Sequence, residues 1–305
     1  IEAVVAAMKQ HSSATKVQDK CCCALWNLAN NAENRKSIAA AGGIEAVVAA
    51  MKQHPSVADV QEKGCGALWN LAINAENKIA IAAAGGIEAV VAAMKQHSSA
   101  TKVQDKCCCA LWNLANNAEN RKSIAAAGGI EAVVAAMKQH PSVADVQEKG
   151  CGALRNLAVD AENRNAIAAA GGIEAVVAAM KQHSSATKVQ EECCCALWNL
   201  AFNNENRRTI AAAGGIEAVV AAMRQHPSAA NVQEKSCGAL MGIAFDNTET
   251  QVAIAAAGGI EAVVAAMRQH SSVADVQEKG CSALWNLAIN AENKKAIAAA
   301  GGIEA

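Results

Sequence analysis

The sequence predicts an all-α protein made of seven tandem repeats, and three observations support this fold class. An isoleucine marks the start of each repeat, and the interval between successive markers is 43 residues, or 44 in one case. Within each repeat, apolar side chains recur every three and four residues, the spacing of one face of an α-helix. Apolar residues make up 52% of the chain and aromatic residues only 2%, so the core must consist mainly of small and aliphatic side chains. This period and composition are typical of an α-solenoid.

The isoleucine markers divide the chain into repeats of similar length. The predicted repeats are 1–43, 44–86, 87–129, 130–172, 173–215, 216–259 and 260–302, and an eighth would start at 303–305. We expect a single domain over 1–305, because repeats bury apolar surface against their neighbours and not in one globular core. The chain begins and stops inside a repeat, so we expect it to be a piece of a longer array.

Two helices are predicted in the first two thirds of each repeat. In the first repeat a short helix covers about residues 1–10, and its apolar stripe is Ile1, Val4, Val5 and Met8. A longer helix follows over about residues 14–29, and its buried stripe is Val17, Cys21, Ala24, Leu25 and Leu28.

A third, shorter helix is predicted after an Asn or Asp that is suited to capping a helix N-terminus. These capping residues are Asn31, Asn74, Asn117, Asp160, Asn203, Asp246 and Asn290. Ile38 anchors this helix in the first repeat. The pair Gly42-Gly43 ends it, as glycine commonly does at a helix C-terminus.

Together these elements resemble the armadillo repeat. The resemblance rests on Val17-Gln18, on Ala24-Leu25-Trp26-Asn27-Leu28-Ala29 and on the run from Glu33 to Ile44, which recur in this order along essentially the whole chain. It implies a right-handed superhelix with three helices per repeat, in which the longest helix of each repeat lines a concave groove. Glu2 follows the marker isoleucine where the family often has proline, so the resemblance leaves the start of the first helix open.

The resemblance also implies a peptide-binding role for an asparagine near the end of each long helix. In armadillo proteins the matching asparagine bonds the backbone of an extended peptide, and an amide suits this role because it both donates and accepts hydrogen bonds. The matching residues here are Asn27, Asn70, Asn113, Asn156, Asn199 and Asn286. The alternative is that the same asparagine bonds a neighbouring repeat.

The residue before this asparagine lies at the edge of the predicted groove, because successive residues of a helix are about 100° apart. It is Trp26, Trp69, Trp112, Arg155, Trp198 or Trp285. A tryptophan here either packs between repeats or contacts a partner. Nuclear-import receptors of this family carry their tryptophan four residues before the asparagine, where this chain has Cys23, Gly66 and Cys109. We therefore do not expect their pockets for basic side chains.

Two repeats depart from the Trp-Asn pattern. Arg155 replaces the tryptophan in the fourth repeat, and Met241-Gly242 replaces both residues in the sixth, which also holds one extra residue within 245–250. If one continuous partner binds the groove, its register should change at these repeats. Random drift in a redundant array is the alternative.

Each repeat has a cysteine at one position of the long helix, and the residues beside it are only Cys, Gly or Ser. The recurring cysteines are Cys22, Cys65, Cys108, Cys151, Cys194, Cys237 and Cys281. We expect the long helices of adjacent repeats to approach closely there. Equivalent cysteines should lie about 8 to 10 Å apart, whereas a disulfide needs Cα atoms within about 7 Å. Reduced thiols, without a signal-peptide pattern, predict a cytoplasmic or nuclear protein.

Charge and composition exclude several classes of function. Lys and Arg number 27 against 28 Asp and Glu, so we expect no nucleic-acid partner. No apolar run reaches the roughly 18 to 20 residues that span a membrane, so we expect no membrane association. The seven histidines occur one per repeat, too far apart to share a metal, and no nucleophile, base and orienting group lie together. We therefore expect neither cofactor, metal nor catalysis.

These arguments favour a non-enzymatic scaffold that binds an extended segment of another protein in its groove. One alternative is a structural element that self-associates end to end, because no polar capping repeat covers Ile1, Val4 and Val5. Another is an adaptor in nuclear transport.

Overall fold

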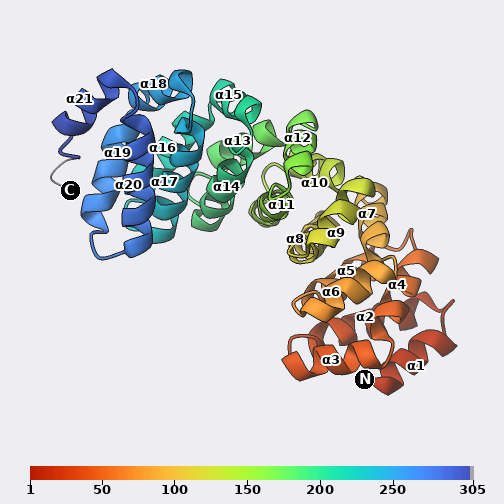
Figure 1. Ribbon diagram of the computed structural model, residues 1–305. Coiled ribbons are helices and arrows are strands. Elements are labelled where there is room, and N and C mark those ends of the chain that lie inside the picture. The colour runs from red at the N-terminus through yellow and green to blue at the C-terminus, as the bar shows by residue number, and fades with distance from the viewer. Residues whose placement is uncertain (303–305) are drawn as a thin grey trace. The chain divides into compact units, whose positions relative to one another are not determined.

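The computed structural model describes residues 1–302, so the predicted start of an eighth repeat at 303–305 lies outside the described residues. Within this part the chain forms 21 α-helices and no β-strand, three helices for each predicted repeat (Figure 1). It consists of two compact units, residues 1–157 and 158–302. The all-α solenoid with three helices per repeat is confirmed, whereas the single domain over all seven repeats stays a prediction.

The helices form three sets according to their place in the repeat. The first helices are α1 (Glu2–Gln10), α4 (Gly43–Gln53), α7 (Gly86–Gln96), α10 (Gly129–Gln139), α13 (Gly172–Gln182), α16 (Gly215–Gln225) and α19 (Gly259–Gln269). The second helices are α2 (Thr15–Leu28), α5 (Ala58–Leu71), α8 (Thr101–Leu114), α11 (Ala144–Leu157), α14 (Thr187–Leu200), α17 (Ala230–Ala244) and α20 (Ala274–Leu287). The third helices are α3 (Ala32–Ala40), α6 (Ala75–Ala83), α9 (Ala118–Ala126), α12 (Ala161–Ala169), α15 (Asn204–Ala212), α18 (Thr248–Ala256) and α21 (Ala291–Ala299).

The second helices stack on one another within each unit. In the first unit α2, α5, α8 and α11 lie side by side, and in the second unit α14, α17 and α20 do so (Figure 1). Their inner faces are fully buried, as Leu25, Leu68 and Leu111 show. Burying one such side chain stabilises the fold by about 1.5 to 3 kcal/mol, so the core is a series of layers, one per repeat.

The glycine pair at each repeat boundary has two separate causes. Gly42 adopts φ +77°, a left-handed conformation that ends α3 and that glycine accepts without a steric penalty. Gly43 is needed for space, because a Cβ atom there would lie 2.5 Å from Cγ2 of Ile38. The predicted helix end at this pair is therefore confirmed, and the third helix packs directly on the backbone of the next repeat.

Asparagine caps the third helices in five repeats. Oδ1 of Asn31 accepts hydrogen bonds from the backbone N–H groups of Glu33 (2.9 Å) and Asn34 (3.1 Å). In the sixth repeat the predicted cap, Asp246, is wrong: the extra residue shifts the cap to Asn247, and Asp246 takes φ 46°. The side chains that cap in this way are those of Asn31, Asn117, Asn203, Asn247 and Asn290.

Side chains of Gln18 and His54 join the first helices to the rest of the fold. The Gln18 side chain donates to the carbonyl oxygens of Met8 (3.0 Å) and His11 (2.9 Å), which end α1. His54 bonds the preceding repeat, since its Nε2 lies 2.7 Å from the carbonyl oxygen of Ser12. Both contacts recur along the chain, so the histidines tie repeats together in addition to any effect on the helix dipole.

Within residues 1–302 no single helix has the length and apolar character of a membrane span. Two sharply bent pairs, α6 with α7 and α18 with α19, meet those criteria only when each pair is taken together.

Candidate interaction surface on the second helices

The predicted asparagines lie near the ends of the second helices, and most of them bond the preceding repeat. Nδ2 of Asn70 donates to the backbone carbonyl oxygen of Trp26 at 3.0 Å and to Oδ1 of Asn30 at 3.0 Å. Only 5% of the Asn70 surface is exposed. The same bond to the carbonyl of the Trp position is made by Asn113 (3.0 Å), Asn156 (2.9 Å) and Asn286 (2.9 Å).

The cause of this bond is the end of the preceding second helix. In the last turn of α2, the N–H of Ala29 donates to Leu25 and the N–H of Asn30 donates to Asn27. Neither of these N–H groups bonds the carbonyl oxygen of Trp26. This carbonyl is one of the last in the helix, which have no hydrogen-bond donor within the helix itself. Asn70 fills that role from the next repeat. The asparagine is thus a cap between repeats, which was the alternative interpretation of its role, and contact with a peptide stays a prediction.

Asn27 differs from this pattern, because it is exposed and its Nδ2 lies 3.8 Å from Sγ of Cys23 in its own helix. Asn199, the last of the six predicted asparagines, is half-buried.

The tryptophans pack on small residues of the following repeat. A Cβ atom on Gly66 would lie 2.7 Å from the ring of Trp26, and one on Gly152 would lie 2.7 Å from the ring of Trp112. These tryptophans are half-buried. The small residue four positions before the asparagine is therefore required by the preceding tryptophan. Whether the exposed edges of Trp26, Trp69, Trp112, Trp198 and Trp285 also contact a partner stays a prediction.

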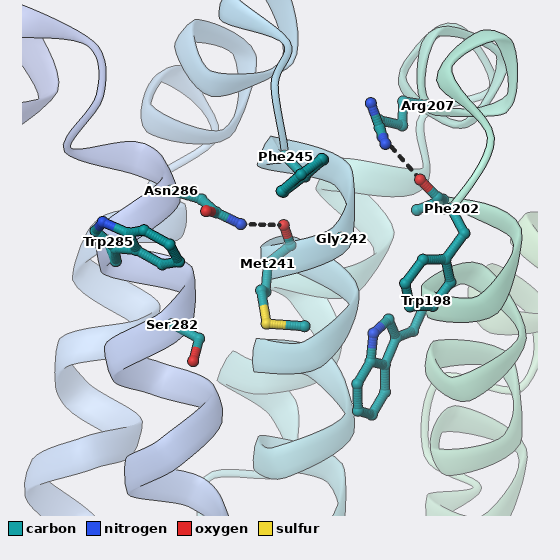
Figure 2. A pocket seen from close by; sticks show the side chains of 10 residues that line it. Trp198, Phe202, Arg207, Met241, Gly242, Phe245, Ser282, Trp285 and Asn286 are labelled. Carbon is teal, nitrogen blue, oxygen red and sulfur yellow. Dashed lines mark hydrogen bonds between the residues drawn. The ribbon is translucent and has the colours of Figure 1, made fainter.

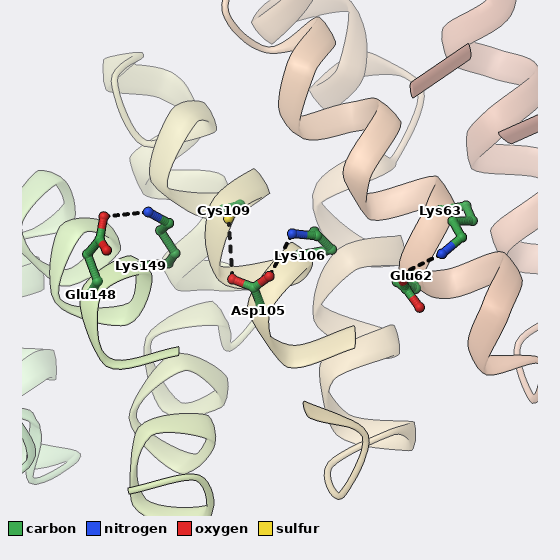
Figure 3. Close-up of polar contacts among 7 residues, drawn as sticks. All are labelled: Glu62, Lys63, Asp105, Lys106, Cys109, Glu148 and Lys149. Atoms are coloured by element: carbon green, nitrogen blue, oxygen red, sulfur yellow. Dashed lines mark hydrogen bonds and ion pairs between the residues drawn. The ribbon is translucent and has the colours of Figure 1, made fainter. Parts of the chain in front are cut away.

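Lysines of the following repeats cover these tryptophan rings. Nζ of Lys106 lies 5.4 Å from the ring centroids of both Trp26 and Trp69, within the range of cation–π attraction. The same ammonium is 2.7 Å from Asp105, and matching pairs join Lys63 to Glu62 and Lys149 to Glu148 (Figure 3). The face of α5, α8 and α11 is therefore lined by lysines, each of which already forms an ion pair with an acid and a cation–π contact with a tryptophan ring.

Arg155 takes part in this layer in place of a tryptophan. Its guanidinium lies 5.6 Å from the ring of Trp112, and its Nε donates to Oδ1 of Asn156 at 3.2 Å. The departure in the fourth repeat thus keeps the cation–π arrangement of its neighbours.

The columns of small residues beside the recurring cysteines have different causes. A Cβ atom on Gly64 would lie 2.6 Å from Met51, in the first helix of the same repeat. This column therefore makes room within a repeat there. Adjacent second helices do meet closely at Cys65, whose sulfur is 3.3 Å from that of Cys107. This pair is offset by one residue from the equivalent cysteines of adjacent repeats, so the predicted spacing of about 8 to 10 Å between equivalent cysteines does not apply to it.

Burial makes some of the recurring thiols poor acids. It raises the pKa of Cys22 to about 12 and that of Cys237 to about 12. Cys281, by contrast, is exposed. Among residues 1–302 no three His, Cys, Asp or Glu side chains gather in a way that would hold a metal ion.

A cavity of about 360 Å³ opens where the sixth repeat departs from the pattern (Figure 2). It is formed by α14, α15, α17 and α20 with the segments that follow α14 and α17, all within the second unit. Its lining residues are Trp198, Ala201, Phe202, Arg207, Met241, Gly242, Phe245, Ser282, Trp285 and Asn286. The irregular sixth repeat was evident in the sequence, but the cavity was not. One sequence feature could have pointed to the cavity: both phenylalanines of the chain lie in the turns after these helices.

Arg207 forms one wall of this cavity and is held there by the protein. Its Nε donates to the carbonyl oxygen of Ala201 at 2.7 Å, and its guanidinium lies 5.2 Å from the ring centroid of Phe245. Burial lowers the pKa of Arg207, and the charge of Asp246 partly offsets this shift. The Arg207 guanidinium is therefore already engaged in contacts with its own chain.

The repeat geometry and this ladder of inter-repeat contacts define an armadillo-type α-solenoid. The family model described as the LRRK2 ARM repeat matches residues 1–128 and 112–301. The chain therefore belongs to the LRRK2 ARM repeat family. No curated protein matches it.

Several solved structures share the fold. One engineered protein is 30% identical with a TM-score of 0.70, and the match covers 99% of this chain and 82% of that one. Another engineered protein is 28% identical with a TM-score of 0.72, covering 81% of this chain and 99% of that one. A designed armadillo repeat protein, in complex with the peptide (KR)4, is 22% identical with a TM-score of 0.67, covering 80% and 99%. The last likeness concerns the fold alone.

Proposed function

We propose that the protein is a non-enzymatic scaffold that binds an extended segment of another protein along the face of its second helices. The observation that supports this most is the regular succession of half-buried tryptophans on α2, α5 and α8, each covered by a lysine of α5, α8 or α11 that is paired with an acid. Packed helices are about 8 to 10 Å apart, and an extended chain advances about 3.3 Å per residue. About three residues of a bound segment would therefore span one repeat.

The lysines on this face restrict the charge of the partner segment that could bind there. The designed relative binds a polybasic peptide, (KR)4. Here Lys63, Lys106 and Lys149 already lie over tryptophan rings, so a second cation would compete with them. We therefore propose a partner segment that is not polybasic. Its backbone would lie on the lysine stems and the outer edges of the rings.

A displayed library of random 12-residue peptides tests this proposal. Binders would be synthesised with a fluorescent label and measured by anisotropy against the full chain. In a variant with Lys63, Lys106 and Lys149 all changed to Ala, we expect the affinity to fall at least tenfold, because the stems that form this surface are removed.

The matched control changes three exposed acids on the third helices, Glu33, Glu76 and Glu119, to Ala. This control should bind the peptide as the parent chain does, and circular dichroism should show both variants to be helical. Equal affinity of the lysine variant and the control would place the peptide elsewhere and contradict the proposed groove.

A further inference from the structure

We infer that the cavity of the sixth repeat is a specificity pocket that takes one neutral, bulky apolar side chain, of the leucine or phenylalanine kind, from the bound segment. The inference rests on the proposed function and deepens it. The chain has seven aromatic residues, five Trp and two Phe, and four of them line this cavity: Trp198, Phe202, Phe245 and Trp285. Its volume of about 360 Å³ lies at the lower end for ligand pockets, a size suited to a single side chain.

The cavity exists because the asparagine of the inter-repeat cap is absent at Gly242. In other repeats this side chain bonds the carbonyl of the preceding Trp position, as Asn286 bonds Met241. Gly242 has no side chain to offer to Trp198. The N–H of Phe202 donates to Asn199, and that of Ala201 donates to Leu197. The sixth repeat thus leaves both a space and an uncapped carbonyl on α14.

A second polar group in the same wall also lacks a partner. Nε1 of Trp198 is buried and has no hydrogen-bond acceptor within the described residues. Figure 2 shows this nitrogen on the side of the ring that faces Met241. A buried N–H without a partner is unfavourable, because it has lost its hydrogen bonds to water. A carbonyl oxygen beside an inserted side chain would satisfy it, so the pocket suits a residue within a peptide better than a hydrocarbon alone.

The charges around the pocket select a neutral side chain. Arg207 already lies over Phe245, and Nζ of Lys279 lies 5.1 Å from the ring centroid of Trp198. An incoming cation would face these two positive charges. Each cation has an acid of the protein beside it, Asp246 near Arg207 and Glu278 paired with Lys279, so an anion gains little. Burial of apolar surface is the remaining source of affinity.

The walls can adjust to such a side chain. Phe202 and Phe245 are 60% and 52% exposed, so an occupant would bury both rings. Met241 of α17 also lines the cavity (Figure 2). Methionine has three rotatable bonds and adapts to different occupants.

The indole N–H signals of the tryptophans in a two-dimensional ¹⁵N NMR spectrum test the inference directly. The probes are the N-acetyl N-methylamides of leucine, phenylalanine, glycine and lysine, and a Trp198→Phe variant assigns the signal. We expect the Trp198 signal to move saturably with the leucine and phenylalanine probes, with Kd on the order of 1 mM for ligands of this size. The glycine and lysine probes should leave it in place.

Two variants and one internal control locate the site. Gly242→Asn restores the side chain found in the other repeats and should weaken binding at least tenfold. An added Cβ would lie 3.2 Å from that of Ala201, so a second variant, Trp285→Ala, removes an exposed wall without that strain. It should also weaken binding. The signal of Trp112, whose repeat neighbour Asn156 keeps its cap, should not respond.

Four results would overturn the inference. Three concern the probes: no movement of the Trp198 signal with any probe, equal binding by the parent chain and both variants, and a stronger response to the lysine probe. The fourth is movement of the signal when the protein is concentrated without a probe, which would assign the pocket to a second copy. Because the probes are single residues, pocket binding can succeed when no extended peptide binds. A peptide that binds the groove without moving Trp198 would leave the proposed function standing and refute only the pocket.

Discussion

Removing the amide of Asn70 tests the central physical claim, that this asparagine is a cap between repeats. In Asn70→Ala the carbonyl of Trp26 and Oδ1 of Asn30 both lose their donor. The carbonyl loses its cap in a seam where Asn70 itself is 5% exposed, so little water replaces the bond. A hydrogen bond is worth about 0.5 to 1.5 kcal/mol net, and a buried unsatisfied acceptor costs about 1 to 3 kcal/mol. We expect the free energy of unfolding to fall by about 2 kcal/mol.

Urea denaturation followed by circular dichroism measures this effect. With a slope of about 2 kcal/mol per M, the midpoint should fall by about 1 M. The chain supplies its own control in Asn27, which occupies the same position in the first repeat but is exposed and bonds no neighbouring repeat. Asn27→Ala should change the stability by less than about 0.5 kcal/mol. If the two variants unfold at the same urea concentration, the cap does not stabilise the array.

Four further predictions concern the cysteines and the caps. Cys65→Leu should lower the unfolding free energy by about 1 to 3 kcal/mol, because its sulfur sits 3.3 Å from another in a fully buried seam; an unchanged melting temperature would contradict this. A native-state thiol titration should label Cys281 within minutes but not Cys22, and rapid labelling of both would show that the seam opens. Burial raises the pKa of Cys22 to about 12 from about 8.5 in an unfolded chain, so the stability it contributes is complete below about pH 8 and is lost as the pH rises towards 12. Urea midpoints at pH 7 and pH 10 should show this fall, and a Cys22→Ala chain should show less of it. Asn31→Ala removes two bonds at the start of α3 and should cost about 1 kcal/mol in the same assay, and an unchanged urea midpoint would contradict this.

The helices and their boundaries followed from short-range patterns. The spacing of Val17, Leu25 and Leu28 predicted a helix over about 14–29, and the structure has Thr15–Leu28. The glycine at 42 and the asparagine at 31 marked helix ends, because each acts on backbone atoms within a few residues of itself. The prediction that Asp246 caps a helix was wrong, because capping acts over so few residues that the one extra residue of the sixth repeat moves the cap to Asn247.

The roles of the groove residues could not be predicted in this way. The sequence marked Asn70 and Trp26 as recurring polar and aromatic residues, but it left open whether each faces a partner or the next repeat. That choice depends on the carbonyl that α2 leaves unpaired at its end and on how closely α5 approaches it. Contacts between residues about 40 positions apart decide both points.

The sequence by itself determined the family, the period and the helix content of this protein, because a repeated pattern of burial and capping is local and recurs in every repeat. Only the tertiary structure decided that tryptophan and asparagine serve the seam between repeats, and that Gly242 opens a cavity lined by Trp198, Phe202, Phe245 and Trp285. The physical reason is that the local helix determines the direction in which each side chain points, whereas the packing of the neighbouring repeat determines which atoms that side chain contacts.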